Sequence, residues 1–159
     1  LALLFAYLFL VAQYESWTIP LSVMLSVLFA VMGALLGLEL TGGDMSIYTQ
    51  LGMVMLIGLA GKNAILMVEF AKTARESGLS IIEAAKQGAS IRFRAVMMTA
   101  WSFLFGVLPL VFATGAGSAS RRAIGITTFA GMLTATLIGI FFIPFLFTLF
   151  ETLREKFHA

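Results

Sequence analysis

The 159-residue sequence contains no cysteine and few charges, and each shortage excludes a class of protein. Without cysteine there is no disulfide scaffold and no thiolate site for zinc or an iron–sulfur cluster. Charged residues make up 11% of the chain, whereas a soluble domain carries roughly a quarter. A water-exposed surface with so few charges would aggregate. The sequence therefore predicts an integral membrane protein.

The abundant residues exclude other classes. A hydrophobic content of 60% is incompatible with disorder. The net charge of +2 does not indicate nucleic-acid binding, because the basic residues lie between apolar blocks and no phosphate-binding loop accompanies them. The only histidine, His158, lies near the C-terminus, and no apolar run contains aspartate. We therefore expect no enzyme, no catalytic residue, no metal site and no cofactor.

Five apolar runs predict an all-α membrane protein. A spanning helix needs about 20 apolar residues, and the chain starts at Leu1 in the middle of an apolar run. We expect that the first helix has lost its beginning and that the sequence is part of a larger protein. The predicted spans are about 1–12, 17–38, 46–71, 94–113 and 123–150.

The connector 72–93 is the only long polar stretch. Within it Ser80 and Glu83 fit a capping box, which predicts a short helix over 80–90 on the membrane surface. Lysines and arginines in the loops favour the cytoplasmic side, and one side has more of them. Seven lie on the side of this connector, against Arg121 and Arg122 on the other: Lys72, Arg75, Lys86, Arg92, Arg94, Arg154 and Lys156. The connector and the C-terminus are therefore expected in the cytoplasm.

Small residues predict close packing between helices. Gly33 and Gly37 form a GxxxG face. The pairs Gly58 with Gly61, and Gly125 with Gly131, are expected to provide further flat surfaces for neighbouring helices.

Lys62 is the one charge deep inside a predicted span. It lies ten residues before Lys72, so at ~1.5 Å per residue it sits ~15 Å from the cytoplasmic edge. A lysine at that depth must face the bundle interior or a water-filled cavity. Glu69 lies ~10 Å lower on the same helix, and no aspartate or glutamate occurs near the middle of any span. The anionic partner is therefore expected from outside this chain. One interpretation is proton or ion translocation, and the other is a lysine that only fixes helix packing.

Two further polar residues have open interpretations. Arg92, with Arg94 beside it, belongs either to a functional ion-pair network or to ordinary positive-inside anchoring. Thr99 lies seven residues beyond Arg92 and on nearly the same helix face. Its hydroxyl either bonds such a network or bonds the carbonyl four residues before it.

Several motifs together resemble one transporter family. The segment Gly58 to Ala71 (GLAGKNAILMVEFA) closely resembles helix ten of the resistance–nodulation–division (RND) multidrug efflux pumps, in their hydrophobe/amphiphile (AcrB-like) branch. The remaining motifs agree in order and spacing: YESWTIP at 14–20, RFRAVMMT at 92–99, TGAGS at 114–118 and FFIP at 141–144. One position departs, since Ala95 stands where members carry a proline that is exchanged at small cost in a first helical turn.

The resemblance implies that this chain is helices eight to twelve of a twelve-helix, proton-driven drug exporter. In that family a helix-ten lysine pairs with two aspartates on helix four, and Lys62 matches the lysine. Arg92 and Thr99 match relay residues of helix eleven, and Asn63 is expected to support the network. The implied partners are the rest of the pump, two further copies in a homotrimer, a periplasmic adaptor, an outer-membrane channel and the bilayer. The implied location is the inner membrane of a Gram-negative bacterium, and the implied consequence is antibiotic resistance.

Two alternatives stay open. A related RND exporter would move metal ions or lipids with the same relay. A purely structural helix bundle would use Lys62 for packing alone.

Overall fold

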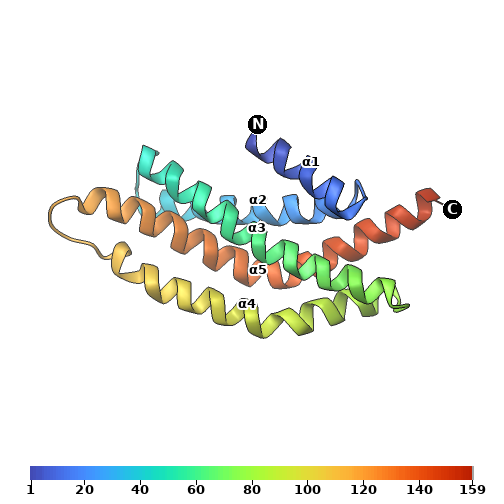
Figure 1. Ribbon diagram of the computed structural model, residues 1–159. Helices are drawn as coiled ribbons and strands as arrows, with labels where there is room; N and C mark the ends of the chain where they lie inside the picture. Colours follow the sequence, from blue (N-terminus) through green and yellow to red (C-terminus); the bar gives the residue numbers. More distant parts are fainter. Residues whose placement is uncertain (159) are drawn as a thin grey trace.

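The structure is a computed structural model that describes residues 1–158. These residues form five α-helices and no strand (Figure 1). The helices are α1 (Ala2–Tyr14), α2 (Ile19–Leu40), α3 (Ile47–Glu76), α4 (Ile81–Val111) and α5 (Ser118–His158). The prediction of an all-α fold with five helices is confirmed.

Four of the helices, α2 to α5, are long and apolar enough to cross a membrane. The shortest of them, α2, has 22 residues, which at ~1.5 Å per residue gives ~33 Å. The hydrocarbon core of a bilayer is about 30 Å thick. By contrast, α1 has 13 residues and is a shorter apolar helix.

The longest helix, α5, is the centre of the bundle. It packs against α2, α3 and α4. The C-terminal end of α1 packs on the bundle, whereas its N-terminal end projects away from it (Figure 1). Two apolar clusters fill the interior. One includes Ile19, Met67 and Phe147. The other includes Leu56 and Met132.

Glycines make the close approach of α2 to α5 possible. A Cβ atom at Gly33 would collide with the side chain of Thr134, and one at Gly37 with the Cβ of Ala130. The predicted GxxxG packing face is therefore confirmed. Gly58 differs from the expectation, because a Cβ there would meet no atom of the described chain within 4 Å.

The segment after Ser80 differs from the prediction in one detail. The capping box of Ser80 and Glu83 is present, but the helix that it starts does not end near residue 90. It continues without interruption to Val111, as one helix of 31 residues (Figure 1). No proline occurs between Ser80 and Pro109 to break it, and Gly88 is held against Ala71 of α3. The expected short surface helix is thus the first part of α4.

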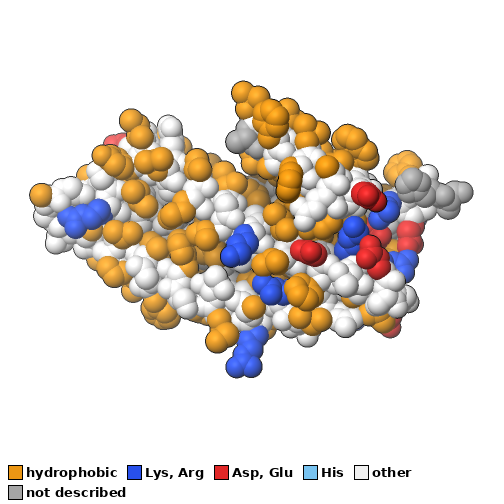
Figure 2. Space-filling view, viewed as in Figure 1, with side chains coloured by type: hydrophobic (Ala, Val, Ile, Leu, Met, Phe, Trp, Pro, Cys, Tyr) orange, Lys and Arg blue, Asp and Glu red, His pale blue; other side chains and the backbone are white. Residues whose placement is uncertain are grey.

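Charged side chains gather at the end of the bundle where α5 terminates (Figure 2). Arg75 of α3 forms an ion pair with Glu155 of α5. Lys72 donates a hydrogen bond of 3.2 Å to the carbonyl of Tyr14 at the end of α1. These contacts join the ends of α1, α3 and α5.

Candidate functional site

Lys62 lies on α3 and lines a groove of about 370 Å³ between α1, α2 and α3. The other lining residues are apolar or glycine, among them Leu3 and Leu10 of α1, Val23 and Val27 of α2, and Ile57 and Ile65 of α3. The Lys62 side chain is exposed at this groove. Its ammonium is therefore presented to whatever packs against this side of the bundle.

The Lys62 ammonium has no anionic partner within residues 1–158, since no ion pair there includes it. Glu69, seven residues further along α3, is exposed and forms no ion pair with any described base. A charge against an apolar wall is unfavourable unless a counter-ion neutralises it or water solvates it. The groove therefore suits a carboxylate from another segment.

Arg92 lies on the first half of α4, over the ring of Phe70. Its guanidinium carbon is 5.3 Å from the ring centroid, a distance suitable for a cation–π contact. The Arg92 Nε is buried and donates to no acceptor in the described chain. A guanidinium normally uses its donors on carboxylates or carbonyls, so Arg92 retains capacity for an additional acceptor.

Thr99 lies on the exposed side of α4. Its hydroxyl donates a hydrogen bond of 2.9 Å to the carbonyl of Ala95 in the same helix, which is the second of the two interpretations above. A threonine hydroxyl has one donor and two acceptor lone pairs. Thr99 therefore uses its proton locally and keeps lone pairs that can accept from an ammonium.

The register between α3 and α4 sets the relative heights of these residues. The two helices run antiparallel, with Gly88 against Ala71 and Arg92 against Phe70. Continuing this register places Thr99 at the level of Lys62. Arg92 lies ~10 Å from that level, because seven residues separate it from Thr99.

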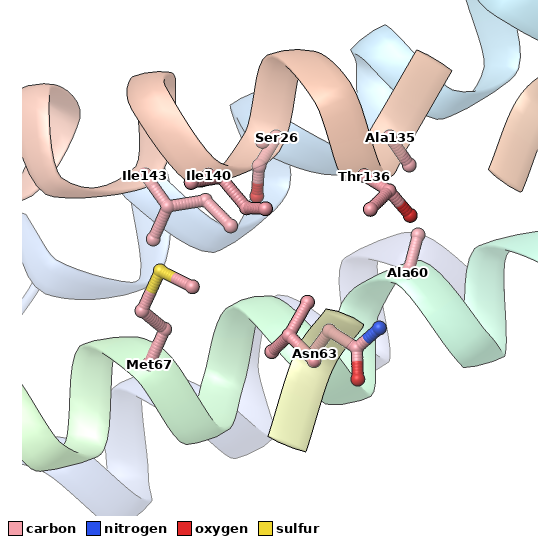
Figure 3. A pocket seen from close by; sticks show the side chains of 10 residues that line it. Ser26, Ala60, Asn63, Met67, Ala135, Thr136, Ile140 and Ile143 are labelled. Atoms are coloured by element: carbon pink, nitrogen blue, oxygen red, sulfur yellow. The ribbon is translucent and has the colours of Figure 1, made fainter. Parts of the chain in front are cut away.

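Asn63 points away from the groove. Successive helical residues are rotated by ~100°, so Lys62 and Asn63 face different neighbours. Asn63 lines a small cavity inside the bundle together with Ser26 of α2 and Thr136 of α5 (Figure 3). In the described chain no hydrogen bond joins any two of Lys62, Asn63, Arg92 and Thr99. Lys62, Asn63 and Thr99 thus lie at one level of the bundle and Arg92 lies ~10 Å away from it, without forming a closed network.

Metal-ligating side chains are not grouped in the described residues. No group of three histidine, cysteine, aspartate or glutamate side chains in the described part of the chain could hold a metal ion. What the groove offers is one primary amine and apolar walls. These groups can neutralise and release a carboxylate.

Comparison with known proteins identifies the family. Residues 1–151 match the AcrB/AcrD/AcrF family. The chain belongs to this family. The toluene efflux pump membrane transporter TtgB of Pseudomonas putida is 44% identical over 153 residues, which are 96% of this chain and 15% of TtgB. The multidrug resistance protein MdtF of Escherichia coli is 44% identical over 158 residues, 99% of this chain and 15% of MdtF.

Membership of the AcrB/AcrD/AcrF family confirms the resemblance to RND efflux pumps. A third relative, the toluene efflux pump membrane transporter TtgE of Pseudomonas putida, is 40% identical over 98% of this chain. The chain spans about 15% of the length of these relatives. Together with the four long apolar helices, the family relationship makes this a multi-pass membrane protein.

Sequence reasoning missed two polar residues that the fold brings to Asn63. Ser26 and Thr136 are single hydroxyl residues within long apolar runs, and nothing in the sequence indicates which way they face. The packing of α5 between α2 and α3 turns both of them toward the interior (Figure 3).

Proposed function

We propose that this chain supplies one side of the proton relay in an exporter of drugs and other amphiphiles that is driven by the proton-motive force. The observation that supports it is the position of Lys62, whose ammonium lies at an apolar groove on a long membrane helix without an anionic partner in residues 1–158. Such a charge is costly in a membrane and is retained where it has a function.

The relay works by electrostatics. Two aspartates, implied by the family resemblance on a helix outside this chain, face Lys62 across the groove. While both are ionised, the Lys62 ammonium neutralises them and is itself neutralised. Protonation of one aspartate weakens this pairing and frees Lys62 to turn toward another acceptor. The electrical driving force is ~2.3 kcal/mol per charge per 100 mV.

The helix α4 provides that acceptor and a second cation. Thr99 stands at the level of Lys62 in the antiparallel register, and the lone pairs of its hydroxyl are available. Arg92 lies ~10 Å nearer the start of α4, and its buried Nε, which lacks an acceptor in the described chain, is available to a carboxylate or carbonyl at that level. Asn63 supports the relay from the opposite side of α3. The change in pairing shifts α3 and α4 relative to each other, and this shift is transmitted to the substrate-binding part of the exporter.

The same proposal includes orientation and assembly. The connector between α3 and α4 and the C-terminus face the cytoplasm of a Gram-negative bacterium, because the basic loop residues lie mainly on that side. The protein acts in the inner membrane as a homotrimer, together with a periplasmic adaptor and an outer-membrane channel.

The test is the variant Lys62→Ala in the complete protein, expressed in a strain that lacks its own exporters. Lys86→Ala is the matched control, because Lys86 is exposed on α4 and takes part in no ion pair of the described chain. The Lys62 variant should lose drug resistance at unchanged expression, whereas the control should keep it. Wild-type resistance in the Lys62→Ala strain would refute the relay.

Lys62→Arg separates a relay from a simple requirement for charge. Arginine stays protonated and presents a wide planar fork instead of a compact ammonium. The relay predicts that this variant also loses drug export. Full export by Lys62→Arg would mean that any cation at this position is sufficient.

A further inference from the structure

A small cavity lies inside the bundle where α2, α3, α4 and α5 meet. Its volume is about 20 Å³. Most of its wall is apolar, with Met67 of α3 and Val96 of α4 among the lining residues. Three polar side chains interrupt this wall: Ser26, Asn63 and Thr136 (Figure 3).

Thr136 is the unusual member of this group. Its side chain is buried, with 6% of the residue exposed, and its Oγ1 has no hydrogen-bond partner within residues 1–158. Two other buried threonines of α5 behave differently. Thr127 and Thr128 each donate a hydrogen bond of 2.7 Å to a carbonyl of the preceding helical turn. A buried hydroxyl without a partner is unfavourable, so the orientation of Thr136 requires an explanation.

The other two polar side chains have free hydrogen-bonding groups as well. Ser26 donates to the carbonyl of Val23 at 2.7 Å, which leaves its lone pairs as acceptors. The Asn63 amide has two donors and a carbonyl acceptor, and none of them is used by another residue of the described chain. Donors from α3 and α5 and an acceptor from α2 therefore converge on one cavity.

The size of the cavity selects its ligand. A cavity of roughly 10–15 Å³ or more holds one water molecule when two to four polar groups surround it. We propose that this cavity is a binding site for one water molecule. The Thr136 hydroxyl and the Asn63 amide donate to the water oxygen, and the water donates to Ser26 Oγ. An organic ligand or a hydrated ion is too large for this volume.

The water joins three helices at a central point. It satisfies the Thr136 hydroxyl and fixes the orientation of the Asn63 amide, the residue next to Lys62. It lies on the opposite side of α3 from the groove, so its presence does not depend on whether Lys62 acts in a relay.

Labelling by hydroxyl radicals tests the site directly, since X-ray pulses generate radicals from bound as well as bulk water. Met67 lines the cavity and is 2% exposed, whereas Met132 is 1% exposed and belongs to the other apolar cluster. In the complete, folded protein, Met67 should be oxidised severalfold faster than Met132. The variant Thr136→Val should reduce the Met67 rate to that of Met132. Equal rates for the two methionines in the wild-type protein would show a dry cavity and overturn the proposal.

Thermal unfolding gives a second, independent readout. Valine has nearly the shape of threonine but no hydroxyl, so Thr136→Val removes only the hydrogen-bonding group. With a bound water, this variant loses a hydrogen bond and should melt below the wild type, as should the control Thr128→Val, which loses a bond within its own helix. A melting temperature of Thr136→Val at or above that of the wild type would mean that Thr136 had no partner to lose, and would also overturn the proposal.

Discussion

The contact between Gly88 of α4 and Ala71 of α3 predicts the effect of a single methyl group. A Cβ atom at Gly88 would lie 2.7 Å from the Ala71 nitrogen and 2.9 Å from its Cα. Ordinary carbon contacts are about 3.5–4.0 Å long. Both opposing atoms belong to the backbone, so no side-chain rotation can relieve the clash. In the variant Gly88→Ala, α3 and α4 must therefore move apart.

A second substitution in the same helix separates the steric cost of Gly88→Ala from its effect on helix propensity. Alanine stabilises a helix interior by about 1 kcal/mol relative to glycine. Gly106 also lies in α4, and a Cβ there would meet no atom of the described chain within 4 Å. Gly106→Ala therefore shows the propensity gain alone. The difference in unfolding free energy between the two variants isolates the steric penalty, for which overpacking gives about 1–3 kcal/mol.

The assay is thermal unfolding of the purified complete protein in detergent, at one fixed protein concentration because oligomers melt at concentration-dependent temperatures. Gly106→Ala should melt at or above the wild-type temperature, and Gly88→Ala should melt below it. If Gly88→Ala is as stable as Gly106→Ala, the close backbone contact between α3 and α4 is not present.

Three further predictions concern a cap, a groove and an ion pair. Ser80→Ala removes the capping box with Glu83. This should lower the unfolding free energy by ~0.5–2 kcal/mol and accelerate amide hydrogen exchange in the first turn of α4. Unchanged exchange would contradict the cap. Gly58→Leu should fill the groove beside Lys62 and abolish drug export without lowering the melting temperature, whereas the control Gly106→Leu should keep export. Export by the Gly58→Leu variant would exclude a docking segment in this groove. Arg75→Met should change the unfolding free energy by no more than ~1 kcal/mol, because its ion pair is partly exposed; a larger loss in a thermal melt would show that the pair is essential to the bundle.

Much of the fold follows from local sequence patterns. Long apolar runs determine the four long helices, and Ser80 with Glu83 starts α4 where the capping pattern indicates. Gly33 and Gly37 pack on α5 as small residues in a membrane helix are expected to do. Each of these features depends on residues that are close together in the sequence, and for that reason it can be predicted from one sequence.

The features that escaped prediction depend on several helices at once. The predicted end of a surface helix near residue 90 is absent, because no residue between Ser80 and Pro109 breaks the helix. The inward orientation of Thr136 depends on how α5 is rotated between its neighbours. In the same way, the sequence shows that Lys62 is a charge deep inside a predicted membrane span. The apolar groove beside it could not be predicted, because residues of three helices form it.

The most direct test of the central claim is proton-coupled transport by Lys62→Met. Methionine keeps an unbranched side chain of similar length without the charge. The complete protein is reconstituted into lipid vesicles, and movement of a fluorescent substrate is followed after a pH gradient is imposed. A proton relay through Lys62 predicts no substrate movement in this variant, although the variant is still folded and inserted in the vesicles. Transport at the wild-type rate would show that Lys62 only fixes the packing of the helices.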